Sequence, residues 1–179
     1  NPYGFSKFLM DKIADRYSRE NPDMVIVGLR FFNVYGTREF FKSKTSSMVI
    51  QLGHQILSGN APLLFEGSDQ IVRDFIYIND VIDALKEISA KPGINGEIFN
   101  VGSGHASSVE NIVNLVCKMT NTDSEVILHD KNDREHDKAG TKGYADIQKI
   151  EKIGWKPKTS LKDGLWKTYE WFTKNIEYY

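Results

Sequence analysis

The sequence predicts an α/β fold, because short apolar runs alternate with segments of helical periodicity along the whole chain. Residues 24–29 form a continuous apolar run rich in β-branched side chains, which is typical of a strand buried on both faces of a parallel sheet. Residues 4–19 precede it and place apolar side chains such as Phe5 and Leu9 four positions apart, as on one face of a helix.

The composition supports a globular protein and excludes several classes of function. The 179 residues are 40% hydrophobic and 26% charged, and 23 Lys and Arg balance 24 Asp and Glu to a net charge of -1. This balance argues against a broad nucleic-acid surface, and no apolar run reaches the roughly 18 residues of a membrane span. The single cysteine, Cys117, cannot form an internal disulfide and is typical of packing in a reducing compartment. We therefore expect a cytoplasmic protein without nucleic-acid or membrane partners.

The middle of the chain continues the alternation. We expect a polar loop over 33–44, a helix over 45–57, and short strands over 63–65 and 74–78. Asn79 or Asp80 is the expected N-cap of the next helix, because a short polar side chain there can accept a hydrogen bond from the first turn.

The last part of the chain repeats this pattern. We expect a strand over 97–101, a helix after Ser107, a strand over 125–128, a charged loop over 129–142, and helices over 146–153 and 160–175. Ser107 with Glu110 three positions later is a capping-box pattern at the start of its helix.

Tyr3 and Lys7 form the first motif with chemical content. Their i, i+4 spacing places both side chains on one face of the predicted helix. An ammonium beside a phenol favours the phenolate, which can act as a base on a sugar hydroxyl. The spacing alone is weak, since many solvated helices carry such a pair by chance.

Three further motifs follow this pair in a fixed order. The four segments are residues 2–7 (PYGFSK), 29–36 (LRFFNVYG), 73–81 (RDFIYINDV) and 99–104 (FNVGSG). Together they resemble the extended short-chain dehydrogenase/reductase family, the NAD-dependent epimerases and dehydratases of nucleotide sugars. The resemblance extends over nearly the whole chain.

The resemblance implies the last part of a Rossmann-type doubly wound parallel sheet plus a small α/β substrate-binding domain. Its Rossmann-derived elements would be about 1–36 and 74–104, and its substrate-binding elements about 37–73 and 105–179. The dinucleotide-binding part of the family would then lie upstream of this chain. We expect a C-terminal portion of a larger enzyme that is inactive by itself and forms a homo-oligomer when intact.

The resemblance also assigns roles to individual residues. Tyr3 corresponds to the catalytic tyrosine, and Lys7 to the lysine that supports its phenolate and contacts the nicotinamide ribose of NAD or NADP. Asn33 corresponds to a substrate-binding asparagine, Val34 to a cofactor contact and Arg73 to a substrate-binding arginine. From chemistry alone, Arg73 suits a pyrophosphate, because a guanidinium can bind it with two parallel hydrogen bonds.

Two regions favour different subgroups of the family. Lys42 resembles the second catalytic base of ADP-glycero-manno-heptose 6-epimerases, and the turn of Phe65, Glu66, Gly67 and Ser68 resembles their substrate-binding turn. Arg134 and Asp137 instead resemble the nucleotide-binding pair of UDP-hexose 4-epimerases. The substrate could therefore be an ADP- or a UDP-sugar, with a nucleotide-sugar 4,6-dehydratase as a further alternative.

Two other patterns carry less weight. Gly102, Ser103 and Gly104 form the one G-x-G of the chain, but it lacks a third glycine, so we expect a tight turn and not a dinucleotide fingerprint. The His and Asp residues of 129–137 fit no standard ligand spacing, so no metal site is expected.

Overall fold

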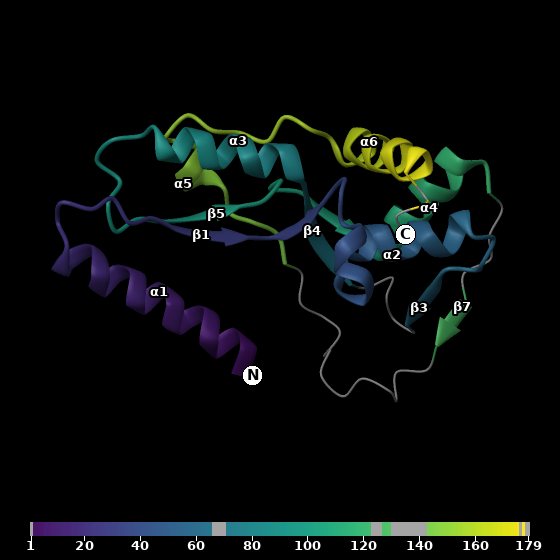
Figure 1. The fold of residues 1–179 in the computed structure, drawn as a ribbon, viewed down its shortest axis with the longest axis horizontal. Coiled ribbons are helices and arrows are strands. Elements are labelled where there is room, and N and C mark those ends of the chain that lie inside the picture. Colours follow the sequence, from purple (N-terminus) through teal and green to yellow (C-terminus); the bar gives the residue numbers. More distant parts are fainter. Residues whose placement is uncertain (1, 66–70, 123–126, 130–142, 176, 178–179) are drawn as a thin grey trace.

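A computed structural model describes residues 2–65, 71–122, 127–129, 143–175 and 177 of the chain (Figure 1). The elements are α1 (Pro2–Glu20), β1 (Gly28–Phe31), β2 (Asn33–Tyr35), the 3-10 helix η1 (Phe40–Thr45), α2 (Met48–Leu57), β3 (Leu63–Phe65), β4 (Val72–Tyr77), α3 (Ile78–Ser89), β5 (Ile98–Val101), β6 (Ala106–Ser108), α4 (Val109–Thr120), β7 (Ile127–His129), α5 (Gln148–Glu151) and α6 (Leu161–Lys174). The alternation confirms the predicted α/β class.

The strands that carry the central motifs are parallel. β1 pairs with β5, β2 pairs with β4, and β3 pairs with β7, each in parallel register. β1 and β2 are separated only by Phe32, whose N–H donates to the carbonyl of Val101 at 3.0 Å. One nearly continuous stretch of chain therefore changes partner from β5 to β4 at this point.

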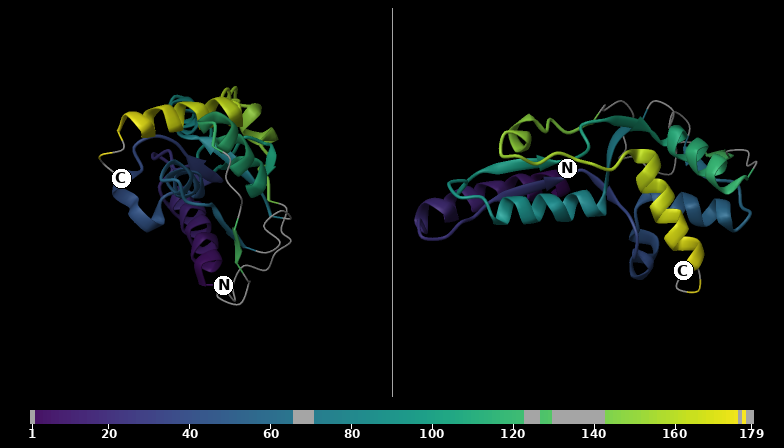
Figure 2. Two further views of the ribbon diagram at one scale, coloured as in Figure 1. Left: turned by 90° about the vertical axis from the view of Figure 1, so that its right-hand side faces the viewer. Right: turned by 90° about the horizontal axis from the view of Figure 1, so that it is seen from above.

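Strand β4 separates two hydrophobic cores. Phe75 and Tyr77 pack with α2, α4 and α6, whereas Ile76 between them packs with α3, β5 and α5. This alternation follows the two-residue period of a strand buried on both faces. Figure 2 shows α6 and α3 along one side of the molecule and α1 apart from them.

Three strand predictions need correction. The predicted polar loop over 33–44 begins with strand β2, because the backbone of Asn33–Tyr35 pairs with β4. The predicted strand over 24–29 begins only at Gly28, and Met24 and Val25 are 52% and 68% exposed. The backbone before Gly28 bonds to a turn instead of a strand, because Ile26 accepts from the N–H of Gly96 and donates to the side chain of Asn95. The strand β6, which pairs antiparallel with β4, has no counterpart in the prediction.

Both predicted helix caps are displaced. α3 begins at Ile78 with Tyr77 as its cap, while the Asp80 carboxylate accepts hydrogen bonds from the N–H groups of Lys158 and Thr159. Ser108, and not Ser107, caps α4, because strand β6 extends to Ser108 before the helix begins. Tertiary contacts moved the cap of α3 by two or three residues and the cap of α4 by one.

Helix α1 confirms the predicted helix but exposes the apolar face that the periodicity identifies. Its exposed apolar side chains are Phe5, Phe8, Leu9, Met10, Ile13 and Tyr17, each at least 42% exposed. Ser18 is its one buried residue among those described, and Asp11 pairs with Arg30 of β1 at 2.5 Å. Within the described ranges, no helix combines the length and apolar character that a membrane crossing requires.

The contact between α2 and α6 gives a test of this packing. A Cβ at Gly53 would lie 1.9 Å from the Tyr169 ring, so Gly53→Ala requires the two helices to separate. We expect it to lower the free energy of unfolding by about 1–3 kcal/mol, measured by urea unfolding. Gly143→Ala is the control, because a Cβ there meets nothing within 4 Å. Equal stabilities of the two variants would contradict this packing.

Candidate active site

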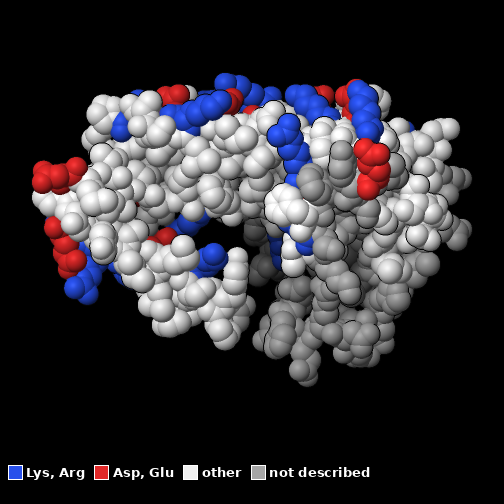
Figure 3. Space-filling view, viewed as in Figure 1, with Lys and Arg blue, Asp and Glu red and all other residues white. Residues whose placement is uncertain are grey.

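Tyr3 and Lys7 lie together at the start of α1. The Lys7 ammonium is 5.2 Å from the centroid of the Tyr3 ring, and the Tyr3 side chain is 71% exposed. The predicted juxtaposition is confirmed, and the phenol is accessible to a ligand. Figure 3 shows an open hollow between α1 and the rest of the molecule, on the side where α1 begins.

Asn33 and Arg73 lie on neighbouring strands. The Asn33 side chain donates from Nδ2 to the backbone carbonyl of Asp74 at 2.9 Å, which places its amide beside the first residues of β4. Arg73 pairs with Gly143 in a parallel bridge, and the N–H of Asp74 donates to the Gly143 carbonyl at 3.0 Å. Three segments distant in sequence therefore meet beside Arg73.

Asp74 holds this meeting point together and was missed by the sequence analysis. Its carboxylate is fully buried and accepts four hydrogen bonds, two from Ser103 (N–H and Oγ), one from the N–H of Gly104 and one from the N–H of Ala145. A buried carboxylate is stable when such donors replace water. The only signal in the sequence was an acid at the first position of a predicted strand, directly before the apolar residues 75–78.

The same contacts explain the Gly102-Ser103-Gly104 turn. The Asp74 carboxylate occupies the N–H groups that a phosphate would use, and a Cβ at Gly102 would lie 2.7 Å from an Asp74 oxygen. Gly104 has φ +74, a conformation that glycine adopts without strain. Residues 102–104 therefore form a tight turn with a structural role, as predicted, and not a phosphate-binding loop.

Lys42 lies in η1, the next element after strand β2 along the chain. Its ammonium is 3.3 Å from Oε2 of Glu39, and 43% of its side chain is exposed. Glu39 is itself buried, and its carboxylate also accepts from Ser47, the N-cap of α2. The predicted polar loop is thus an ordered segment anchored by a buried acid, a feature without a sequence signal.

The remaining predicted site residues are placed only in part. Val34 is half-buried in β2 and packs against the core that contains Ile76. Phe65 ends strand β3. Glu66, Gly67, Ser68, Arg134 and Asp137 lie outside the described residues.

Three other tyrosines differ from Tyr3. Burial, followed by the charge of Asp80, raises the pKa of Tyr35 and of Tyr77 above the ordinary value. Burial also raises the pKa of Tyr169, whose hydroxyl donates to the carbonyl of Val49. These phenols stay protonated and pack in the hydrophobic core, whereas Tyr3 is exposed next to an ammonium.

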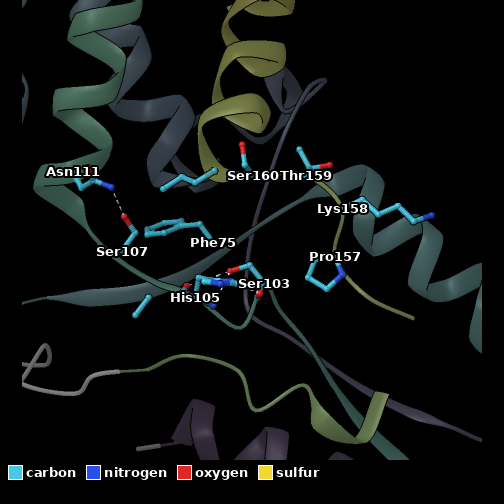
Figure 4. Close-up of a pocket in the computed structure, with 11 residues that line it drawn as sticks. Phe75, Ser103, His105, Ser107, Asn111, Pro157, Lys158, Thr159 and Ser160 are labelled. Carbon is cyan, nitrogen blue, oxygen red and sulfur yellow. Dashed lines mark hydrogen bonds between the residues drawn. The ribbon is translucent and has the colours of Figure 1, made fainter. Parts of the chain in front are cut away.

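A separate cavity of about 420 Å³ lies between α4, α6 and the segment that leads into α6 (Figure 4). Its hydroxyl groups already have partners, since Ser103 bonds Asp74, Thr159 bonds Asp80 and Ser160 bonds Asp163. None of the predicted site residues that the structure describes lines it. Among the described residues there is also no group of three potential metal ligands.

Comparison with known families fits this arrangement. The profile of the GDP-mannose 4,6 dehydratase family matches residues 1–168. The chain belongs to this family of nucleotide-sugar epimerases and dehydratases. The assignment confirms the coarse resemblance drawn from the four motifs.

Solved structures of this epimerase/dehydratase family are similar to the chain over nearly its whole length. UDP-glucose 4-epimerase of Thermotoga maritima, crystallised with UDP-glucose, has 29% sequence identity and a TM-score of 0.86, covering 98% of this chain and 54% of that one. ADP-L-glycero-D-manno-heptose-6-epimerase of Helicobacter pylori has 34% identity and a TM-score of 0.81, with 95% and 50% coverage. The chain thus spans about half the length of these structures.

A third structure supports the fold. The dTDP-glucose 4,6-dehydratase of Bacillus anthracis, solved with NAD, has 23% identity and a TM-score of 0.83, covering all of this chain and 54% of that one. Epimerases and dehydratases with different nucleotides therefore share this half of the fold, so the fold does not determine the substrate.

Proposed function

We propose that the intact protein is a nucleotide-sugar epimerase that uses bound NAD or NADP for transient oxidation to a keto sugar. Its activity would be most like that of ADP-glycero-manno-heptose 6-epimerase. The observation that carries this choice is Lys42, a second ammonium held by a buried carboxylate in the segment that follows the strand of Asn33. The 34% identity to the Helicobacter pylori heptose epimerase supports it.

Each residue has a role that its position suits. Tyr3 would take the proton from the sugar hydroxyl, and Lys7 would stabilise the phenolate. Lys42 would exchange a proton with the same oxygen from the opposite face. Asn33 and Arg73 would orient the sugar and the pyrophosphate, together with residues 65–68, Arg134 and Asp137.

The dinucleotide would accept a hydride from the sugar carbon and return it. Lys7 fits beside its ribose, because an ammonium close to an exposed phenol can bond a ribose hydroxyl and the phenolate together. Val34 would contact the dinucleotide from β2. The structures solved with NAD support the first of the two proposed cofactors, NAD.

A UDP-hexose 4-epimerase or a 4,6-dehydratase is the second candidate. The TM-score of 0.86 to UDP-glucose 4-epimerase favours it, as do Arg134 and Asp137 in the sequence. In the 4-epimerase reaction Tyr3 alone would exchange the proton, and Lys42 would have no part.

Lys42→Ala separates the two candidates. In the full-length protein, assayed with ADP- and UDP-sugars, we expect it to lower kcat at least tenfold, since one of two proton-exchanging groups is lost. Lys86→Ala is the control, because Lys86 is an exposed lysine of α3 with only a 4.0 Å ion pair. Unchanged turnover of a folded Lys42→Ala variant would exclude the heptose-type reaction and favour the second candidate.

A proposal of a different class concerns the chain by itself. It could act as a sugar-nucleotide-binding unit that keeps Asn33, Arg73 and Arg134 but does not catalyse. Calorimetry with NAD, NADP, ADP-sugars and UDP-sugars tests this. Sugar-nucleotide binding without cofactor binding supports it, and tight cofactor binding by the chain alone contradicts it.

We also propose that the intact protein is a cytoplasmic homo-oligomer. The apolar stripe of α1 that contains Phe5, Leu9 and Ile13 is costly to leave in water, so a second copy or the rest of the intact protein must cover it. Light scattering of the full-length protein tests it, and a monomer at micromolar concentration would contradict it.

A further inference from the structure

Glu39 is a buried acid whose hydrogen bonds connect three separate elements. Its side chain is 6% exposed. Oε1 accepts from the N–H of Gly36 at 3.3 Å and from Oγ of Ser47 at 2.8 Å. Oε2 accepts from the N–H of Ser47 at 2.8 Å and from the Lys42 ammonium at 3.3 Å. The carboxylate is therefore fixed by backbone and hydroxyl donors independently of the lysine.

These contacts close the segment between β2 and α2. Gly36 follows the last residue of β2, and Ser47 caps α2, so one carboxylate joins both ends of the intervening segment. Arg38, next to Glu39, has φ +67, which a residue other than glycine adopts only when its surroundings hold it there. The segment is held in one conformation.

The Lys42 ion pair differs from the other lysine pairs of the described structure. Their carboxylate side chains are 33–51% exposed, as for Glu151 and Glu170, and such pairs contribute little because both partners move in water. Glu39 cannot move with its lysine, since Ser47 and Gly36 hold it. It thus restricts where the Lys42 ammonium can lie, while 43% of the Lys42 side chain remains accessible.

We propose that Glu39 is a positioning residue for Lys42, a rigid anchor that holds the lysine ammonium at one place beside the substrate site. The proposal rests on the proposed function, in which Lys42 exchanges a proton with the sugar oxygen. Proton transfer requires the two atoms to come within hydrogen-bond distance, so an ammonium on a free four-carbon chain would be in place only part of the time.

Glu39→Gln in the full-length protein is the first test. The amide keeps the size of the side chain and one acceptor oxygen. It loses the charge that holds the ammonium and, with the second oxygen, the acceptor of either the Gly36 or the Ser47 N–H. We expect kcat to fall about tenfold with KM changed less than twofold. Adding Glu39→Gln to Lys42→Ala should lower kcat no further, because an anchor without its lysine has nothing to position. The control is Glu110→Gln, an exposed acid in the first turn of α4.

The second test does not depend on activity. Acetic anhydride modifies free amines, and mass spectrometry gives the rate for each lysine. In Glu39→Gln we expect Lys42 to be modified several times faster relative to Lys86, whose own pair is untouched. Glu110→Gln should leave the ratio unchanged.

The outcomes separate this inference from the proposed function. The positioning role is supported if Glu39→Gln speeds the modification of Lys42 and lowers kcat, and if it lowers kcat no further in a chain that already carries Lys42→Ala. An unchanged modification ratio overturns it, and so does a kcat loss that adds to that of Lys42→Ala, which would indicate general damage to the segment. If Lys42→Ala remains fully active while the ratio rises, the proposed function fails and Glu39 anchors a lysine without a part in turnover, which also overturns the positioning role.

Discussion

Tyr3→Phe is expected to lower kcat of the full-length enzyme by about 10²- to 10⁴-fold, the usual contribution of a positioned acid–base group. The change removes one hydroxyl from a side chain that is 71% exposed, so the fold should be unaffected. Lys7 remains in place, and binding of NAD or NADP should persist. Steady-state turnover, with cofactor affinity measured separately, checks both expectations.

Tyr17→Phe is the matched control for this variant. Tyr17 lies on the same helix and is 54% exposed, but the residue four positions after it is Asn21 and not a lysine. Removal of the Tyr17 hydroxyl should leave kcat within about twofold of the value for the unmodified enzyme. Turnover in Tyr3→Phe equal to that in Tyr17→Phe would show that Tyr3 does not exchange the proton.

Asp74→Asn is expected to lower the free energy of unfolding by about 3 to 5 kcal/mol. Each carboxylate oxygen accepts two hydrogen bonds, so an NH₂ group in place of either oxygen leaves two donors facing another donor. A lost hydrogen bond to a buried charge costs about 1.5–3 kcal/mol, and the site is closed to water. Urea unfolding of the full-length protein measures the loss.

The same variant should also weaken sugar-nucleotide binding. Asp74 holds Ala145, and Gly143 two residues earlier forms a bridge with Arg73, so release of this segment disturbs a candidate phosphate contact. Asp83→Asn is the control, because Asp83 lies on α3 and makes only exposed ion pairs. It should change stability by less than about 0.5 kcal/mol. Similar unfolding midpoints for the two variants would contradict the role given to Asp74.

The local sequence pattern was sufficient to predict several features of this protein. The 3.6-residue period identified α1, and the fixed i, i+4 geometry of a helix placed Lys7 beside Tyr3. Apolar runs located β3, β4 and β5 to within about two residues. These properties depend on neighbours along the chain, which the sequence contains directly.

The predictions that were wrong concern residues whose bonding partners are far away in the chain. Residues 24–27 have the composition of a strand, yet none of the described strands pairs with them, since the turn at Asn95 and Gly96 bonds Ile26. Asp80 resembles a helix cap but accepts from Lys158 and Thr159, 78 and 79 residues away. Composition does not specify where such donors will be.

The sequence by itself determined the α/β class, the Tyr3 and Lys7 pair and, through its ordered motifs, the family. Only the tertiary structure identified Glu39 and Asp74 as anchors and brought Asn33, Arg73 and Gly143 together. The reason is physical. A helix or strand follows from periodicity, whereas a buried carboxylate becomes stable only where folding gathers enough donors from separate segments to replace its water.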